Sequence, residues 1–341
     1  MKWKSDRLGW QGVDPQAPSV IELRETLAKH NGIASLTICD PDDFEQIQRC
    51  FYRDGFVVVH SILEDEALER LQRDCDDVVY DIVSQDDHAR GNRGSHRYSF
   101  GGASLTGAQL HREGWFQLID HEPLNAVVRA LFQSEDYIVR SAGGDFCLPG
   151  AIDYQPLHSD MQDRSIHIAP DGTPFVHGAF YDPEGLINYR DLPCPFIACN
   201  ILTCDMTALN GATRQIPGTQ RSREPMPTLN DEPEWMRFST VSPAPAGAAL
   251  FRDVRAWHGG TPNVSDHVRA IPNIEFYAPW FRERLQPSIS RSDFARLSHA
   301  GQRRCRFIIE QADAPLRIGY RVDLGYSPNP FLAAGKSKPT T

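Results

Sequence analysis

The chain has 341 residues and a formal net charge of −10 at pH 7. A broad phosphate-backbone footprint needs clustered Lys and Arg, so this charge argues against a nucleic-acid partner. The chain shows neither the roughly 18 consecutive apolar residues of a membrane helix nor the apolar core of a signal peptide. Eight cysteines without a C-x-x-C pair predict buried free thiols. We therefore expect a cytoplasmic globular protein, either a monomer or a homodimer, without a membrane partner.

The N-terminal part of the chain predicts helices around one strand. Asp40 is expected to cap a helix that ends at Gly55, because glycine readily adopts the left-handed conformation found at helix C-termini. A strand follows Gly55, and Ser61 with Glu64 suggests a capping box for a second helix. That helix carries a long apolar stripe, which indicates core packing. Residues 84–105 are polar and rich in Gly, which predicts a loop.

The pattern changes from Tyr137 onward. Short apolar runs are separated by Gly, Pro, Asn and Asp, which is typical of a β sandwich or barrel. Strands are predicted over residues 137–141, 196–203, 248–252 and 274–277. Because helices come first and strands later, we expect the helices to pack against one face of a β core.

The predicted organisation is an N-terminal extension, residues 1–40, followed by one domain over residues 41–341. Helical support is expected over about residues 41–135, and the β core over about residues 136–282. Residues 285–341 match no pattern and receive no assignment.

Two motifs carry candidate metal ligands. In QPLHSDM, His158 and Asp160 are two residues apart, so in a strand both side chains point to the same face. This pattern alone is common by chance, and a hydrogen-bonded or surface histidine is its simpler interpretation. In WHGGTPN, His258 precedes two glycines, where the backbone leaves space around the ring. Two histidines and one carboxylate form the facial triad that suits Fe(II) oxygenases.

Arg269 follows His258 by eleven residues. A turn between them brings a following strand back beside the first, and Arg269 then enters the same cavity. A guanidinium pairs with a carboxylate in bidentate fashion, as the distal carboxylate of 2-oxoglutarate requires. The simpler interpretation of Arg269 is a surface salt bridge. Arg140 and Arg214 are the next candidates for this anchor.

These motifs together resemble the phytanoyl-CoA dioxygenase family. NGATRQIPGTQ resembles the family's N-G-x-x-R-x-x-P-G-S-H segment, and HGGTPNVSDHVR, which ends at Arg269, resembles its H-G-x-x-x-N-x-S-x-x-x-R block. FYRDGFVVV resembles its N-terminal opening, so the resemblance covers about residues 41–282. Gln220 departs from the commoner His. Pro272 falls inside the strand expected after Arg269, which predicts a bulge or an edge position.

The resemblance implies a mainly β fold with flanking helices around a double-stranded β-helix, also called a jelly-roll or cupin-like core. It implies an iron(II) dioxygenase that uses 2-oxoglutarate and O2. The implied metal ligands, which are also the catalytic residues, are His158, Asp160 and His258. By motif position, the residues that resemble co-substrate-binding residues are Arg269, Gln155 and Thr213.

The implied reaction is oxidation, chiefly hydroxylation, of a small organic molecule, for example in natural-product biosynthesis, with release of succinate and CO2. An acyl-CoA 2-hydroxylase is the alternative, although the chain lacks an obvious Lys/Arg-rich surface for CoA phosphates. Related iron halogenases have Ala or Gly in place of Asp160, so oxygenation without halogenation is expected. A zinc hydrolase, which leaves Arg269 unexplained, and a non-catalytic jelly-roll binding module also stay open.

Residues 162–195 interrupt the predicted barrel and are rich in Pro, Gly and aromatic side chains. Long loops in compact domains are often functional lids. Because the segment starts two residues after Asp160, we expect it to close over the substrate, with Arg164, Tyr181 and Arg190 as substrate contacts. The simpler interpretation is that its rings only attach the loop to the barrel.

Overall fold

The computed structural model describes residues 8–101, 106–161, 165–168, 171–177, 182, 184–314 and 316–319. Within these residues, a seven-stranded sheet has the order β1-β2-β9-β7-β11-β4-β3. β1 pairs with β2 in parallel, and all other neighbours are antiparallel. The strands are β1 (Ile38–Cys39), β2 (Phe56–Val59), β3 (Arg97–Phe100), β4 (Ile138–Cys147), β7 (Phe196–Ile201), β9 (Ala249–Asp253) and β11 (Arg269–Tyr277).

A second, smaller sheet pairs β8 (Arg214–Gln215) with β10 (His258–Gly259). Single bridges extend it, from His158 to His258 and from Arg214 to Thr240. Residues from both sheets line one cavity. The chain therefore has the predicted mainly β fold, a double-stranded β-helix with flanking helices.

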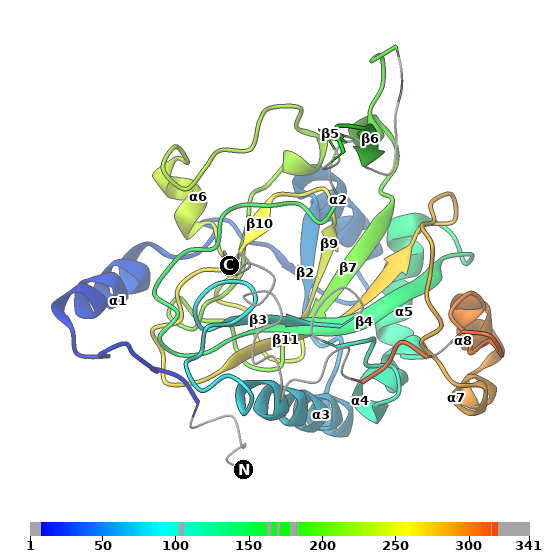
Figure 1. Cartoon of the computed structure of the whole chain (residues 1–341), viewed down its shortest axis with the longest axis horizontal. Helices are drawn as coiled ribbons and strands as arrows, with labels where there is room; N and C mark the ends of the chain where they lie inside the picture. The colour runs from blue at the N-terminus through cyan, green and yellow to red at the C-terminus, as the bar shows by residue number, and fades with distance from the viewer. Residues whose placement is uncertain are drawn as a thin grey trace.

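Helices cover the outer face of the large sheet. They include α2 (Phe44–Asp54), α3 (Asp65–Val83), α4 (Glu113–Phe116) and α5 (Glu122–Phe132), and Figure 1 shows α3 and α4 beneath the sheet. Strand alternation sends Ile274 and Phe276 of β11 into the same apolar cluster as Val78 and Ile82 of α3. α1 (Pro18–His30) lies apart from this layer and packs against Val264.

The sequence located helices better than it located their first residues. Asp43, not Asp40, caps α2, and its carboxylate accepts a first-turn backbone N–H at 3.0 Å. Gly55 ends α2 as predicted, with φ at 83°. The predicted capping box is wrong, because α3 begins at Asp65 and its N-cap residue Glu64 makes no side-chain cap.

Two segments predicted as loops contain strands. Residues 84–105 include β3, which pairs with β4 at the edge of the large sheet. Residues 162–195 include a hairpin of β5 (Ser165–Ile168) and β6 (Pro174–His177), and a 3-10 helix, η3 (Tyr189–Asp191). Residues 84–105 contain few apolar residues, so the alternation that reveals a half-buried strand is weak there. β5 and β6 have only four residues each, which is short for a strand to be recognised among Pro and Gly.

Pro272 does not cause a bulge in β11. The register shift lies between Glu275 and Phe276 instead. On the other side of β11, the pairing with β7 begins at Asn273, so Pro272 lies just beyond it. A proline is tolerated at this point because no ladder partner on that side needs its missing N–H.

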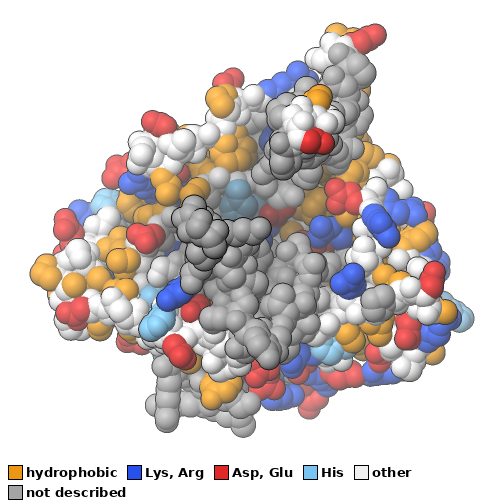
Figure 2. Space-filling model, in the orientation of Figure 1, with side chains coloured by type: hydrophobic (Ala, Val, Ile, Leu, Met, Phe, Trp, Pro, Cys, Tyr) orange, Lys and Arg blue, Asp and Glu red, His pale blue; other side chains and the backbone are white. Residues whose placement is uncertain are grey.

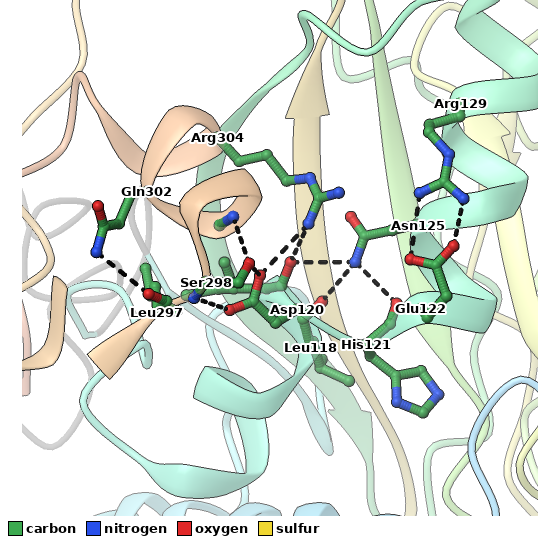
Figure 3. Close-up of polar contacts among 12 residues, drawn as sticks. Leu118, Asp120, His121, Glu122, Asn125, Arg129, Leu297, Ser298, Gln302 and Arg304 are labelled. Carbon is green, nitrogen blue, oxygen red and sulfur yellow. Dashed lines mark hydrogen bonds and ion pairs between the residues drawn. The ribbon is translucent and has the colours of Figure 1, made fainter. Parts of the chain in front are cut away.

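The C-terminal segment that the sequence left unassigned contains α7 (Arg291–Arg296) and α8 (His299–Cys305). The Ser298 N–H and hydroxyl donate to the Asp120 carboxylate at 2.8 and 2.6 Å. Arg304 donates to the Ile119 carbonyl at 2.9 Å. Figure 3 shows this network around Asp120. These bonds attach the C-terminal helices to the turn before α5.

In the described part of the chain, no helix has the length and apolar character needed to cross a bilayer. All eight cysteines are free, as predicted, and only Cys204 is half-buried rather than buried. Burial raises the pKa of the Cys204 thiol to about 11, so this thiol is protonated at neutral pH.

Candidate active site

His158, Asp160 and His258 converge, with their ligand atoms all within 4.8 Å of one another. The backbones of His158 and His258 exchange two hydrogen bonds of 2.9 Å each. This bridge sets the imidazole centroids 4.2 Å apart, and Asp160 Oδ1 lies 3.6 Å from His258 Nε2. The small sheet thus assembles the predicted cluster from two segments far apart in sequence. Figure 2 shows histidine and acidic surface together at a depression near the centre of this face.

Both histidines are oriented by backbone carbonyls. His158 Nδ1 lies 3.2 Å from the Pro156 carbonyl, and His258 Nδ1 lies 3.0 Å from the Ala256 carbonyl. A carbonyl can only accept, so we assign the ring proton to Nδ1 in each case. This tautomer leaves the Nε2 lone pair of each ring available to a metal ion.

The protonation states of the cluster suit metal binding. Burial lowers the pKa of His158, and it lowers the pKa of His258 well below the usual value, with a further contribution from Arg252. Burial tends to raise the pKa of Asp160, but Arg252 and the two histidines outweigh it and hold this pKa well below the usual range. The site therefore offers two neutral imidazoles and one carboxylate at neutral pH, the forms that bind metal.

Arg252 of β9 is a partner of this cluster that the sequence reasoning missed. Its Nη1 donates to Asp160 Oδ2 at 2.7 Å. Arg252 Nη1 also lies 3.0 Å from His258 Nδ1. Both of these nitrogens carry protons in the assigned tautomer, so they cannot hydrogen-bond to each other, and we assign the hydrogen bond of Nη1 to Asp160. An arginine inside the apolar strand ALFRD was the available signal, because a buried guanidinium needs a partner.

Arg269 has the properties expected of a carboxylate anchor. It is 3% exposed and lines the cavity that contains the triad. Its Nε donates to the Gly211 carbonyl at 3.0 Å, while its Nη1 has no partner among the described residues. The other two candidates are engaged, since Arg140 pairs with Glu275 and Arg214 with Glu232.

Gln155 and Thr213 also line this cavity. The Gln155 side-chain carbonyl accepts from the Gly260 N–H at 3.0 Å, which leaves its NH2 group as a donor. A Cβ at Gly260 would lie 2.5 Å from Nη1 of Arg97, so a larger residue there would have to displace this buried guanidinium. The structure thus explains the second glycine after His258 by the close approach of a buried arginine.

The cavity has a volume of about 690 Å³. Among the described residues, the triad, Arg269, Gln155 and Thr213 all contribute to its lining. Large parts of its wall were not identified from the sequence and come from the large sheet, including Arg97, Ser99, Asp145, Asn200, Asn273 and Glu275.

The three predicted substrate contacts are not brought together in the described structure. Arg164 and Tyr181 lie outside the described residues. Arg190 is 8% exposed and donates to the Thr219 carbonyl at 3.2 Å, and it is not among the residues that line the cavity. Its contacts join η3 to the segment after β8, and closure of residues 162–195 over a substrate stays a prediction.

The site fits a ferrous ion and 2-oxoglutarate. Two imidazoles and one carboxylate supply three ligands, which leaves further positions of an iron centre open. Within the described ranges, Arg269 Nη1 is a buried nitrogen without a partner in the same cavity, and a dicarboxylate that also reaches the metal would satisfy it.

The model of the phytanoyl-CoA dioxygenase (PhyH) family matches residues 51–271. The chain belongs to this family. It is thus a non-haem iron, 2-oxoglutarate-dependent oxygenase, and the matched range contains the triad and Arg269. A search of curated proteins finds no match to the chain.

Among solved structures, the chain is similar to AviO1 from Streptomyces viridochromogenes Tue57, with 18% identity, a TM-score of 0.47, and coverage of 74% of this chain and 99% of that one. HygX from Streptomyces hygroscopicus, with nickel and 2-oxoglutarate bound, has 15% identity, a TM-score of 0.44, and coverage of 71% and 89%. The epimerase SnoN from nogalamycin biosynthesis, in complex with Fe3+, alpha ketoglutarate and nogalamycin RO, has 15% identity, a TM-score of 0.43, and coverage of 70% and 84%.

Proposed function

We propose that this oxygenase hydroxylates a small organic molecule, with iron(II) held by His158, Asp160 and His258. We assign 2-oxoglutarate to Arg269, with Gln155 and Thr213 beside it. One observation carries the assignment: the triad shares a cavity with a buried guanidinium, one nitrogen of which has no partner among the described residues.

The residues of the chain prepare this chemistry by placement. The Pro156 and Ala256 carbonyls fix the two imidazoles, and Arg252 holds the outer oxygen of Asp160, so the three ligands are oriented before metal binds. Iron with bound 2-oxoglutarate supplies the oxidative decarboxylation, which yields succinate and CO2 and is coupled to oxidation of the substrate. Arg269 orients the co-substrate by its distal carboxylate.

Asp160 also bears on the type of oxidation. A halogenating iron site needs a free ligand position for the halide, and the carboxylate of Asp160 fills that position. We therefore propose oxygenation without halogenation. Chlorinated product from the wild-type enzyme in chloride buffer would contradict this part of the proposal.

The zinc hydrolase is the second candidate for the same triad. A zinc hydrolase assigns no role to Arg269. In the structure this arginine is buried, and one of its nitrogens has no partner in the described part of the chain. Iron chemistry with 2-oxoglutarate gives that nitrogen a partner, so we favour it over hydrolysis.

The test is release of labelled CO2 and succinate from 2-oxoglutarate by the full chain, with Fe(II) and O2, while candidate substrates are screened. We expect release that depends on Fe(II) and O2 and increases with a true substrate. Release of neither product under any condition, together with Zn²⁺-dependent hydrolysis of an ester or amide, would favour the hydrolase and overturn the proposal.

A further inference from the structure

Three polar side chains on the inner face of the large sheet point to the chemistry of the substrate. Strand pairing places Asn273 of β11 directly opposite Asn200 of β7, and Asp145 of β4 opposite Ile271. Directly opposite side chains are about 5 Å apart at Cβ, and diagonal ones about 7–8 Å. All three residues line the active-site cavity, so one small molecule can contact them together. We call Asp145, Asn200 and Asn273 the substrate face.

The two asparagines have unused hydrogen-bonding capacity. Asn200 is 4% exposed, yet neither its amide nor that of Asn273 makes a hydrogen bond with any described residue. Each amide offers two donors and one acceptor oxygen. Buried polar groups in native proteins nearly always have partners, so we expect a bound molecule to provide them.

Asp145 adds an acceptor to this surface. Its carboxylate forms no ion pair with a residue in the described ranges. The Ser99 side chain, opposite it on β3, donates to this carboxylate, and its remaining lone pairs stay available as acceptors. An alkyl or acyl chain would cover this carboxylate and the two amides without satisfying them, and that is unfavourable. Hydroxyl groups can donate to the carboxylate and exchange bonds with both amides.

The charges in the cavity argue against a multiply anionic substrate. Of the five arginines in the described lining, three are already engaged within the protein: Arg140 with Glu275, Arg252 with Asp160, and Arg97 with Cys147 and two backbone carbonyls. Arg269 is assigned to 2-oxoglutarate, which leaves Arg93 on the exposed side. The described part of the lining therefore has few cations left for the phosphates of a CoA thioester.

The substrate has room beyond the co-substrate. β11 advances about 3.3 Å per residue, so Asn273 is about 13 Å along the strand from Arg269, and Glu275 lies further still. On the proposed assignment, 2-oxoglutarate would lie between Arg269 and the triad, which line the same cavity. The rest of the inner face faces the remaining volume.

We infer that the substrate is a neutral, multiply hydroxylated molecule, such as a sugar or cyclitol unit, and that the substrate face binds its hydroxyl groups. This inference rests on the proposed function, because it uses the assignment of Arg269 to 2-oxoglutarate.

The experiment measures binding rather than turnover. The full chain is loaded with Zn²⁺, which has no redox activity, and with 2-oxoglutarate. Saturation-transfer NMR then compares myo-inositol and methyl glucoside with octanoyl-CoA. We expect saturation transfer from the protein to both polyols and little transfer to the acyl group of octanoyl-CoA. Asn200→Leu and Asn273→Leu keep a similar volume but remove the amide, and each should reduce polyol transfer at least threefold. Asn230→Leu, at an exposed position, is the matched control and should have no effect.

Each outcome decides the inference. Absence of transfer from both polyols, or stronger transfer from octanoyl-CoA, overturns it. An unchanged polyol signal in both variants with a raised 2-oxoglutarate requirement assigns the amides to the co-substrate and also overturns it. Formation of the iron–2-oxoglutarate complex is measured separately by visible absorption. If that complex forms while the polyols fail to bind, the substrate inference fails and the proposed function stands.

Discussion

The two faces of the large sheet differ sharply, although alternate residues of the same strands build them. On the helix side, Ile274 and Phe276 are fully buried in the main apolar core. On the cavity side, Asn273 and Arg269 of the same strand line the active site, and each has a polar group without a partner in the described chain. The helix side is complete by itself, whereas the cavity side is completed by ligands. Stability and chemistry should therefore be separable by substitutions two or three residues apart.

The largest effect should come from the metal ligands on the cavity side. His158→Ala, Asp160→Ala and His258→Ala should each abolish turnover, because each removes one of three ligands. Succinate release and bound iron per chain are the measurements. Full activity in any of the three variants would remove that residue from the metal site.

The helix side should respond in stability alone. Phe276→Ala removes a fully buried ring, and such truncations cost about 3–5 kcal/mol of unfolding free energy. Urea unfolding measures the change. At urea concentrations below the unfolding transition, the variant should bind as much iron per folded chain as the wild type does. If iron binding is lost while stability is unchanged, the two faces are not separable as described.

Arg269→Ala should mainly affect the co-substrate. Removing a buried charged partner costs about 2–5 kcal/mol, so the 2-oxoglutarate requirement should rise well over tenfold with little change in unfolding free energy. Arg303→Ala, at an exposed position in α8, is the matched control. An unchanged requirement would move the anchor to Arg140 or Arg214.

Arg252→Leu should have a smaller effect, on metal affinity. Loss of a group that orients a metal ligand typically costs about 10–100-fold in affinity. Metal titration of the variant measures this, and Arg252→Lys should recover part of the loss because it retains one donor to Asp160. Equal affinity in the leucine variant would show that Arg252 does not position the carboxylate.

The sequence was sufficient to predict those parts of the site whose residues lie close together along the chain. His158 and Asp160 lie in one short motif, and His258 and Arg269 lie in another. The sequence therefore showed both the spacing of these residues and the types of side chain they offer. Four strands of the large sheet were also found, but two of them were predicted too short, since β4 runs from Ile138 to Cys147 and β11 from Arg269 to Tyr277. The predicted caps of α2 and α3 failed because Asp and Ser occur at several positions near each start, and only the fold decides whether one of them caps.

The sequence did not reveal what depends on strand pairing. Arg252 meets Asp160 because the Asp160 N–H donates to the Val254 carbonyl just after β9, and Asn200 faces Asn273 because β7 pairs with β11. Neither contact has a spacing along the chain that identifies it. β3 was missed for a related reason, since RYSF gains its partners only at the sheet edge beside β4.

The most direct test of the central claim is anaerobic titration of the full chain with Fe(II), followed by 2-oxoglutarate, with visible absorption as the readout. The account predicts one Fe(II) per chain, a weak charge-transfer band when 2-oxoglutarate is added, and a much higher 2-oxoglutarate concentration to reach the band in Arg269→Ala. Two results would contradict the claim that iron and 2-oxoglutarate meet in this cavity. One is binding of one Fe(II) per chain without a charge-transfer band, and the other is a band that needs the same 2-oxoglutarate concentration in Arg269→Ala as in the wild type.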